Sequence, residues 1–157
     1  MMDETDESKR ARFAVLVHVA LLKSGEVFLL KRQNTGVMDG SYCFPGGHME
    51  HGESLKEAAL RECREEVGEQ PSNLDPISIF SYRDGGNQGV NFVFLAECWS
   101  GRPLVSEPEN FSGGDFFSLK ALPEPIPEWV RDTVKSFEGG KRGISLIEKV
   151  PEELMDS

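Results

Sequence analysis

Apolar residues at the start of the chain come in short runs separated by turn residues. Two runs, residues 12–22 and 26–32, flank a Lys-Ser-Gly tripeptide, which predicts two strands joined by a short turn. Residues 33–40 contain polar side chains and two glycines, so we expect a loop there. The fold is therefore expected to begin with a β-hairpin, and the loop that follows is a natural place for selectivity.

The middle of the chain changes to the period of a helix. Leu60, Cys63 and Val67 recur at i, i+3 and i+7, which puts them on one side of a helix and predicts that this side packs inward. Strand and turn patterns then return, with one more helix near the end. We expect strands over residues 77–82, 90–97, 115–119 and 144–147, a long flexible loop over residues 83–89, and a helix from near Pro127 that stops at Gly139 and Gly140.

Length and composition are those of one soluble domain. The 157 residues can bury a single core, and 38% of them are hydrophobic. No apolar run approaches the roughly 20 residues of a membrane-spanning helix, so a membrane protein is excluded. We assign residues 1–11 to a disordered acidic tail without a secretion signal, residues 12–150 to the domain and residues 151–157 to a second tail, and we expect a cytoplasmic protein.

Charge and cysteine content narrow the classes of partner. A net charge of −10 disfavours binding to long nucleic acid, whose affinity comes largely from Lys and Arg on phosphates. The three cysteines show no Cys-x-x-Cys spacing, which argues against both a disulfide framework and a zinc site. A small phosphorylated substrate remains compatible with this composition.

The candidate chemistry lies on the second side of the central helix. Glu62, Glu65 and Glu66 are spaced at i, i+3 and i+4, so a helix brings their carboxylates to one face. Like charges crowded in this way repel each other unless a cation neutralises them. Mg²⁺ or Mn²⁺ is the natural candidate, because both take oxygen ligands and are often completed by substrate phosphates. The alternative is a solvated acidic surface with i, i+4 ion pairs.

A tight turn precedes this helix. Phe44 and Pro45 are followed by Gly46 and Gly47, and glycines can adopt backbone angles closed to other residues and let a ligand approach the chain. The carbonyl of Gly46 is a further candidate metal ligand.

Turn and helix together resemble the Nudix hydrolase signature, Gly-x5-Glu-x7-Arg-Glu-U-x-Glu-Glu-x-Gly-U, where U is a bulky aliphatic residue. Every charged and glycine position is filled with the right spacing over residues 47–69, which makes this match far more specific than a lone glycine-rich loop. The matching residues are Gly47, Glu53, Arg61, Glu62, Glu65, Glu66 and Gly68. The two U positions hold Cys63, which can still pack, and Glu69, which suggests an exposed helix exit.

The resemblance implies a single-domain α/β fold, the Nudix-type α/β/α sandwich with a mixed β-sheet. It also implies a magnesium-dependent hydrolase in which Glu62, Glu65, Glu66 and Gly46 bind the metal and Glu65 or Glu66 serves as base. Gly47, Arg61 and Gly68 would support the site. Glu53 has two interpretations: an acid favourable to the start of the helix, or a partner that orients Arg61.

Outside the signature, four residues are further candidates. Similar enzymes often place an extra catalytic or metal-binding glutamate just before the strand that here contains Phe116 and Phe117, so Glu109 is our catalytic candidate, while Glu107 is assigned to substrate binding. Both also fit an acidic surface loop. Arg32 ends a strand near the loop, where a guanidinium suits phosphate oxygens, and the alternative is a surface arginine of an edge strand. Phe44 is a candidate for stacking on a base, and the alternative is a core residue.

The expected reaction is hydrolysis of a phosphoanhydride bond in a nucleoside diphosphate linked to another group. Because the chain is short, we expect a nucleoside triphosphate pyrophosphohydrolase acting on a small nucleotide. Hydrolysis of a nucleotide sugar, a dinucleotide or an RNA cap is the alternative within enzymes, and a noncatalytic nucleotide-binding sensor is the alternative from another class. A homodimer is compatible with the resemblance, since similar enzymes often dimerise.

Overall fold

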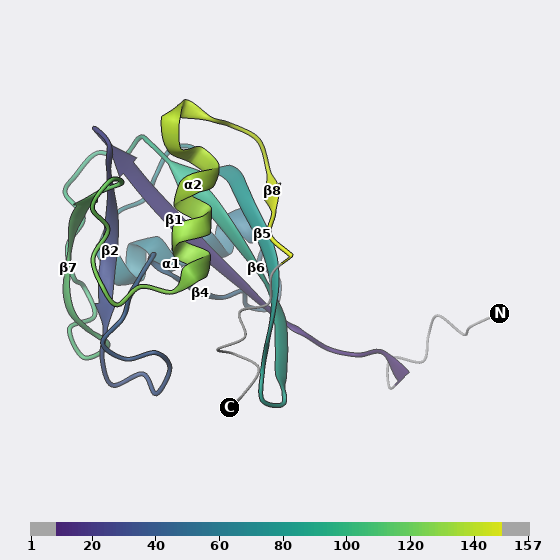
Figure 1. The fold of residues 1–157 in the computed structure, drawn as a ribbon. Helices are drawn as coiled ribbons and strands as arrows, with labels where there is room; N and C mark the ends of the chain where they lie inside the picture. The colour runs from purple at the N-terminus through teal and green to yellow at the C-terminus, as the bar shows by residue number, and fades with distance from the viewer. Residues whose placement is uncertain (1–8, 149–157) are drawn as a thin grey trace.

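The computed structural model describes residues 9–148, which form one mixed eight-stranded sheet with helices on both faces (Figure 1). The tails expected at residues 1–11 and 151–157 lie outside this range except for residues 9–11. The elements are β1 (Ala14–Lys23), β2 (Glu26–Arg32), β3 (Tyr42–Cys43), β4 (Gly46–His48), α1 (Leu55–Val67), β5 (Asp75–Asp84), β6 (Asn87–Ala96), β7 (Phe111–Ser118), α2 (Glu128–Phe137), the short 3-10 helix η2 (Glu138–Gly140) and β8 (Ser145–Leu146).

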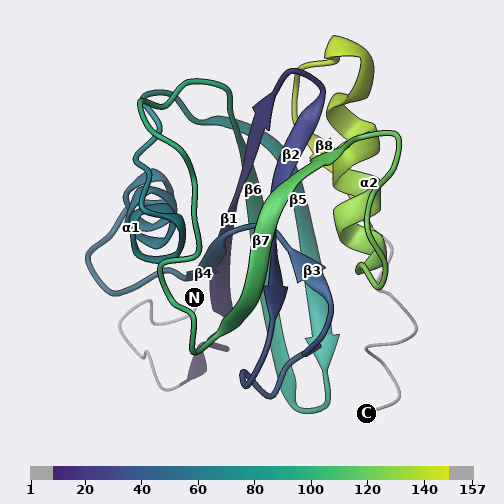
Figure 2. The same cartoon turned by 90° about the vertical axis from the view of Figure 1, so that its left-hand side faces the viewer.

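The order of strands confirms the predicted mixed sheet. The main path runs β3-β2-β1-β6-β5-β8, while β4 pairs with β1 and β7 pairs with β2. The β1–β6 and β5–β8 pairs are parallel, and the other pairs are antiparallel. Figure 2 shows α1 on one side of the strands and α2 on the other. The chain is therefore the α/β/α sandwich that the resemblance implied.

Apolar side chains of the two helices fill separate cores on the two faces of the sheet. Cys63 and Val67 of α1 are buried with residues of β1 and β2, as their spacing predicted, and half-buried Leu60 packs at the edge of this cluster. Val130 and Val134 of α2 are buried on the opposite face. Neither helix among the described residues is long and apolar enough to cross a membrane.

The second hairpin differs from its prediction. Residues 83–89 were expected to be a long flexible loop, but β5 and β6 continue through most of them and leave only Gly85 and Gly86 as the turn. Gly85 has a φ of 57°, a left-handed conformation that glycine takes without strain and that tight hairpin turns require. The last helix agrees with its prediction, because Pro127 is its N-cap and residues 138–140 end it as a 3-10 turn.

The start of α1 is fixed by a reciprocal capping box. The backbone N–H of Glu57 donates to the Ser54 hydroxyl at 3.1 Å, and the backbone N–H of Ser54 donates to the Glu57 carboxylate at 2.8 Å. Two N–H groups that a helix leaves without partners are thereby satisfied. The cap sets where the helix begins, and with it the register of the carboxylates further along.

Replacing Ser54 should test this cap. We expect Ser54→Ala to lower the free energy of unfolding by about 1 kcal/mol, because the N–H of Glu57 loses its partner. Ser54→Asp, which keeps an accepting oxygen, should be close to wild type. Urea denaturation measures both. An equal loss in the two variants would show that the hydroxyl acts in some way other than capping.

Candidate active site at the turn and helix α1

The glycines of the predicted turn, Gly46 and Gly47, belong to strand β4, and this strand lies directly against the carboxylates of α1. The backbone N–H of Gly46 donates to Glu66 Oε2 at 3.0 Å. A Cβ added to Gly47 would lie 2.6 Å from the Glu62 carboxylate, and one added to Gly46 would lie 2.2 Å from the carbonyl oxygen of Val17. At Gly46 the collision is with the backbone of β1, so only glycine fits there, whereas a side chain at position 47 would displace the Glu62 carboxylate.

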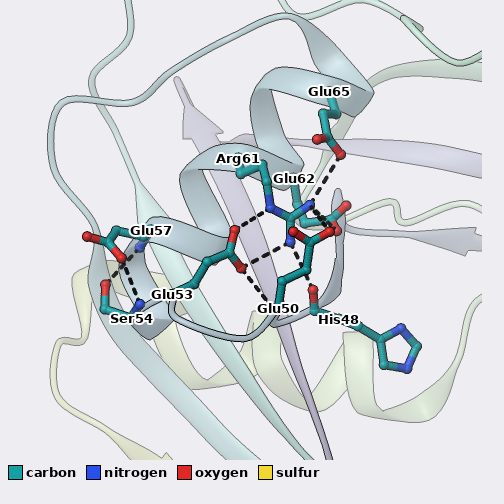
Figure 3. A network of polar contacts seen from close by, with 8 residues as sticks. All are labelled: His48, Glu50, Glu53, Ser54, Glu57, Arg61, Glu62 and Glu65. Carbon is teal, nitrogen blue, oxygen red and sulfur yellow. Dashed lines mark hydrogen bonds and ion pairs between the residues drawn. The ribbon is translucent and has the colours of Figure 1, made fainter.

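Arg61 of α1 connects the helix to β4 and to the loop between them (Figure 3). Its Nε and Nη2 donate to the two carboxylate oxygens of Glu53, and Nη2 also donates to the carbonyl of His48 at 3.0 Å. Its Nη1 reaches Glu62 at 3.0 Å and Glu65 at 3.3 Å. The hydrogen bond with Arg61 lowers the pKa of Glu53, and the same bond raises the pKa of Arg61. Of the two interpretations of Glu53, the structure therefore shows the geometry of a partner that orients Arg61.

Two of the carboxylates are withdrawn from solvent. Glu66 is buried, and only 13% of the Glu62 side chain is exposed, whereas Glu65 is exposed. Burial raises the pKa of Glu66 well above its usual value; the Gly46 N–H opposes this rise, and the neighbouring Glu62 and Glu107 add to it. Negative charge on this face is therefore unfavourable until a cation joins it.

Glu107 approaches the helix carboxylates, and Glu109 is the more exposed of the two. Partial burial, followed by repulsion from Glu109, Glu62 and Glu65, raises the pKa of Glu107. The negative charge of Glu107 in turn adds to the rise in the pKa of Glu66. The sequence favours Glu109 for catalysis and Glu107 for substrate binding. In the structure Glu107 is the half-buried one of the two, and its neighbour Ser106 donates a backbone hydrogen bond to the Glu66 carbonyl.

Arg32 and Phe44, both assigned to substrate, have different surroundings. Arg32 is half-buried, with Nε donating to the carbonyl of Val37 at 2.8 Å and Nη1 lying 3.9 Å from the Cys43 sulfur. It thus lies under the β2–β3 loop. Phe44 has 1% of its surface exposed and packs with its ring centroid 5.9 Å from that of Trp129. The structure contradicts a stacking role for Phe44, because the ring belongs to the core under α2.

A family model settles what this arrangement belongs to. Residues 11–137 match the NUDIX domain, a range that includes the turn, α1 and α2. The chain belongs to the Nudix hydrolase family. The fold is shared as well: the crystal structure of MutT NUDIX hydrolase from Burkholderia pseudomallei superposes with a TM-score of 0.75 and 27% identity, over 80% of this chain and 98% of that one.

Two curated Nudix relatives carry named activities. The ADP-ribose pyrophosphatase of Methanocaldococcus jannaschii is 30% identical over 113 residues, which are 71% of this chain and 65% of that protein. The 8-oxo-dGTP diphosphatase of Escherichia coli is 28% identical over 111 residues, 71% of this chain and 84% of that protein. The chain thus covers slightly less than two thirds of the archaeal relative.

The two departures from the Nudix signature are both buried. Cys63 packs in the α1 core, as expected of a small apolar residue. Glu69 was expected to mark an exposed helix exit, and this is wrong, because only 7% of its surface is exposed. Gly68 ends α1 with a φ of 75° and turns the chain so that Glu69 points inward, where it accepts a hydrogen bond from the Gly101 N–H.

One buried polar pair had no signal in the sequence. His18 Nε2 lies 2.8 Å from Asn91 Oδ1, and the two residues come from the parallel strands β1 and β6. Burial lowers the pKa of His18 to about 4, so the ring is neutral at pH 7. It packs against Trp129 and beside Gly46. A strand residue flanked by valines would have been found only by knowing which strand pairs with β1.

The donor set suits the divalent cation that the Nudix family implies. Glu62, Glu65 and Glu66 offer oxygen only, and a bound cation would offset the cost of ionising buried Glu66 beside Glu62. Within residues 9–148, however, no three His, Cys, Asp or Glu side chains stand close enough together to hold a metal ion. Arg61 engages Glu62 and Glu65, so these side chains must exchange partners for a cation to bind.

Arg61→Lys should separate the organising role of Arg61 from its charge. Lysine keeps the charge but cannot bind Glu53 through two nitrogens while also reaching His48 and Glu62. We expect the melting temperature to fall and kcat for hydrolysis to drop by about 10–100-fold. Arg64→Lys, on the exposed side of α1, is the matched control. Equal effects of both substitutions would refute the organising role.

Proposed function

We propose that this protein hydrolyses a phosphoanhydride bond in a nucleoside diphosphate linked to another group, with Mg²⁺ or Mn²⁺ as cofactor. The observation that carries the proposal is the contact of the Gly46–Gly47 turn with Glu62 and Glu66. This contact brings the backbone of Gly46 and Gly47 together with the partly desolvated carboxylates of Glu62 and Glu66 in one corner. An ordinary solvated acidic surface would leave these carboxylates exposed.

The residues near α1 take three roles in this proposal: metal binding, action as the base, and support of the site. Glu62, Glu65 and Glu66 would hold the metal, with the Gly46 carbonyl as a further ligand. Bound Mg²⁺ supplies charge stabilisation for phosphoryl oxygens and an acidified water. Glu65 or Glu66 would orient that water as base, and Glu107 replaces Glu109 as the additional carboxylate. Arg61 and Glu53 hold the corner in shape.

For the substrate, we propose a small nucleotide contacted by Arg32, whose guanidinium lies beneath the loop after β2. A nucleoside triphosphate is the first candidate, in keeping with the Escherichia coli relative that is named an 8-oxo-dGTP diphosphatase. ADP-ribose is the second candidate, since the Methanocaldococcus jannaschii relative is named an ADP-ribose pyrophosphatase. Both present a pyrophosphate joined to a nucleoside.

Product analysis with Mg²⁺ tests the proposal. The panel comprises canonical nucleoside triphosphates, 8-oxo-dGTP, ADP-ribose, nucleotide sugars and dinucleoside polyphosphates. We expect metal-dependent release of a nucleoside monophosphate from at least one substrate. Glu66→Gln should lower kcat by at least about 100-fold, because the buried carboxylate beside Gly46 is lost.

The control for this substitution is Glu138→Gln, which removes an exposed carboxylate in η2 on the far side of the sheet from α1. It should leave turnover unchanged. If no panel member is hydrolysed while nucleotides still raise the melting temperature, the enzyme proposal fails and the protein is a nucleotide-binding sensor.

A paired substitution separates the two glutamates before β7. Glu107→Gln should lower kcat by about tenfold or more, because Glu107 interacts with Glu62, Glu65 and Glu66. Glu109→Gln should change kcat little. Steady-state kinetics at saturating Mg²⁺ measures both. A larger loss of kcat for Glu109→Gln than for Glu107→Gln would instead identify Glu109 as the additional carboxylate.

A further inference from the structure

The segment that brings Glu107 to the site is docked on the end of α1. Residues 97–110 connect β6 to β7 and run beside α1 in Figure 2. The backbone N–H of Leu104 donates to the Val67 carbonyl at 3.1 Å, and that of Ser106 donates to the Glu66 carbonyl at 2.9 Å. These carbonyls belong to the last turn of α1 and have no acceptor role within the helix. Docking therefore completes the helix end and places Glu107 next to it.

The far end of the same segment is tied to the loop after β2. The Gln33 backbone N–H donates to the Asn110 carbonyl at 2.9 Å, and its side-chain amide donates to the Pro108 carbonyl at 2.7 Å. Glu107 thus sits between two anchors, one on α1 and one on the β2–β3 loop. Its place depends on both.

Glu69 provides the contact at the beginning of the docked segment. Its carboxylate accepts a hydrogen bond from the Gly101 N–H at 3.2 Å. The fit is close, because a Cβ added to Gly101 would lie 2.2 Å from Glu69 Oε1. Glu69 follows the cap of α1, so this contact joins the helix that carries the candidate metal ligands to the segment that carries Glu107.

Position 69 holds a buried carboxylate just after the end of α1. Burial of a carboxylate is unfavourable unless hydrogen bonds compensate for lost hydration. An aliphatic side chain would fill the same place without that penalty, and a hydrophobic contact is common just after a helix that ends in this way. The carboxylate is therefore more than a packing element, and what it adds is the directed bond to Gly101.

We infer that Glu69 is a positioning residue for the active site: by holding Gly101 it fixes the segment 101–106 against α1 and thereby sets Glu107 at the end of the helix that carries the candidate metal ligands. The inference rests on the proposed function, in which Glu107 is the additional carboxylate. It assigns no direct contact between Glu69 and the substrate. Its effect should therefore appear in kcat and in metal dependence rather than in KM.

Kinetics of Glu69→Leu and Glu69→Gln are the first test. Leucine fills the space without accepting a hydrogen bond, whereas glutamine keeps a carbonyl oxygen for the Gly101 N–H. With the substrate found for the wild type, Glu69→Leu should lower kcat by about tenfold or more and raise the Mg²⁺ concentration for half-maximal rate, with KM little changed. Glu69→Gln should restore most of kcat. Equal kcat in the wild type and Glu69→Leu would overturn the inference.

Amide hydrogen exchange supplies a readout that does not depend on activity. In folded Glu69→Leu, the amides of Gly101, Leu104 and Ser106 should exchange faster than in the wild type, while those of β1 stay protected. Gly101→Ala, which pushes against the carboxylate from the other side, should reproduce this pattern. In the double variant the two effects should be less than additive, because both break one contact.

The outcomes separate this inference from the proposed function. An active wild type with unchanged exchange in Glu69→Leu would overturn the positioning role alone. A wild type without activity on any substrate would overturn the proposed function, and the positioning role with it, even if exchange responds. Loss of kcat together with faster exchange, both reversed in Glu69→Gln, would establish the role.

Discussion

The site depends on Arg61, which holds carboxylates together that would otherwise repel. Its guanidinium binds Glu53 with two nitrogens, reaches Glu62 and Glu65 on its own helix, and bonds the His48 carbonyl of the turn. A planar group with several fixed donors can make these contacts at once, and an ammonium group cannot. Without this group, the hydrogen bond from the Gly46 N–H to Glu66 would still join β4 to the helix, but the carboxylates would lose the cation that they share.

Backbone geometry at the two glycines of β4 and at the ends of α1 supports this ion-pair network. Gly46 and Gly47 allow the chain to pass between β1 and α1 where a Cβ would collide. The capping box at Ser54 fixes where α1 begins, and Gly68 fixes where it ends. The acidic face is thus held in register from both ends of the helix. Metal binding would add charge compensation to a corner whose backbone is already in place.

Much of this could be predicted because the signature is local. Glu62, Glu65 and Glu66 share a face through helical spacing alone, and Gly47, which lies against Glu62, belongs to the same signature. Residues set by distant packing were beyond this reasoning. Phe44 faces Trp129, which is 85 positions away in the chain, and Glu69 meets Gly101 across the docked segment. No periodicity in the sequence reveals such contacts.

The choice between Glu107 and Glu109 shows the same limit. Both lie in one acidic stretch, and the sequence does not reveal that the Ser106 N–H binds the Glu66 carbonyl, which places Glu107 at the end of α1. The prediction of a long loop between β5 and β6 was wrong for a local reason, since an Asp-Gly-Gly-Asn sequence fits a loop as well as a tight turn. Backbone geometry around glycine was the undetermined quantity there.

The most direct measurement is a crystal structure with Mn²⁺ and a nonhydrolysable nucleotide, in which the anomalous signal locates the metal. Our account predicts a peak in contact with carboxylate oxygens of Glu62, Glu65 and Glu66, close to the Gly46 carbonyl, with the nucleotide phosphates completing its shell. Bound nucleotide with the metal elsewhere, or with no metal at all, would contradict the assignment of this corner as the reaction centre.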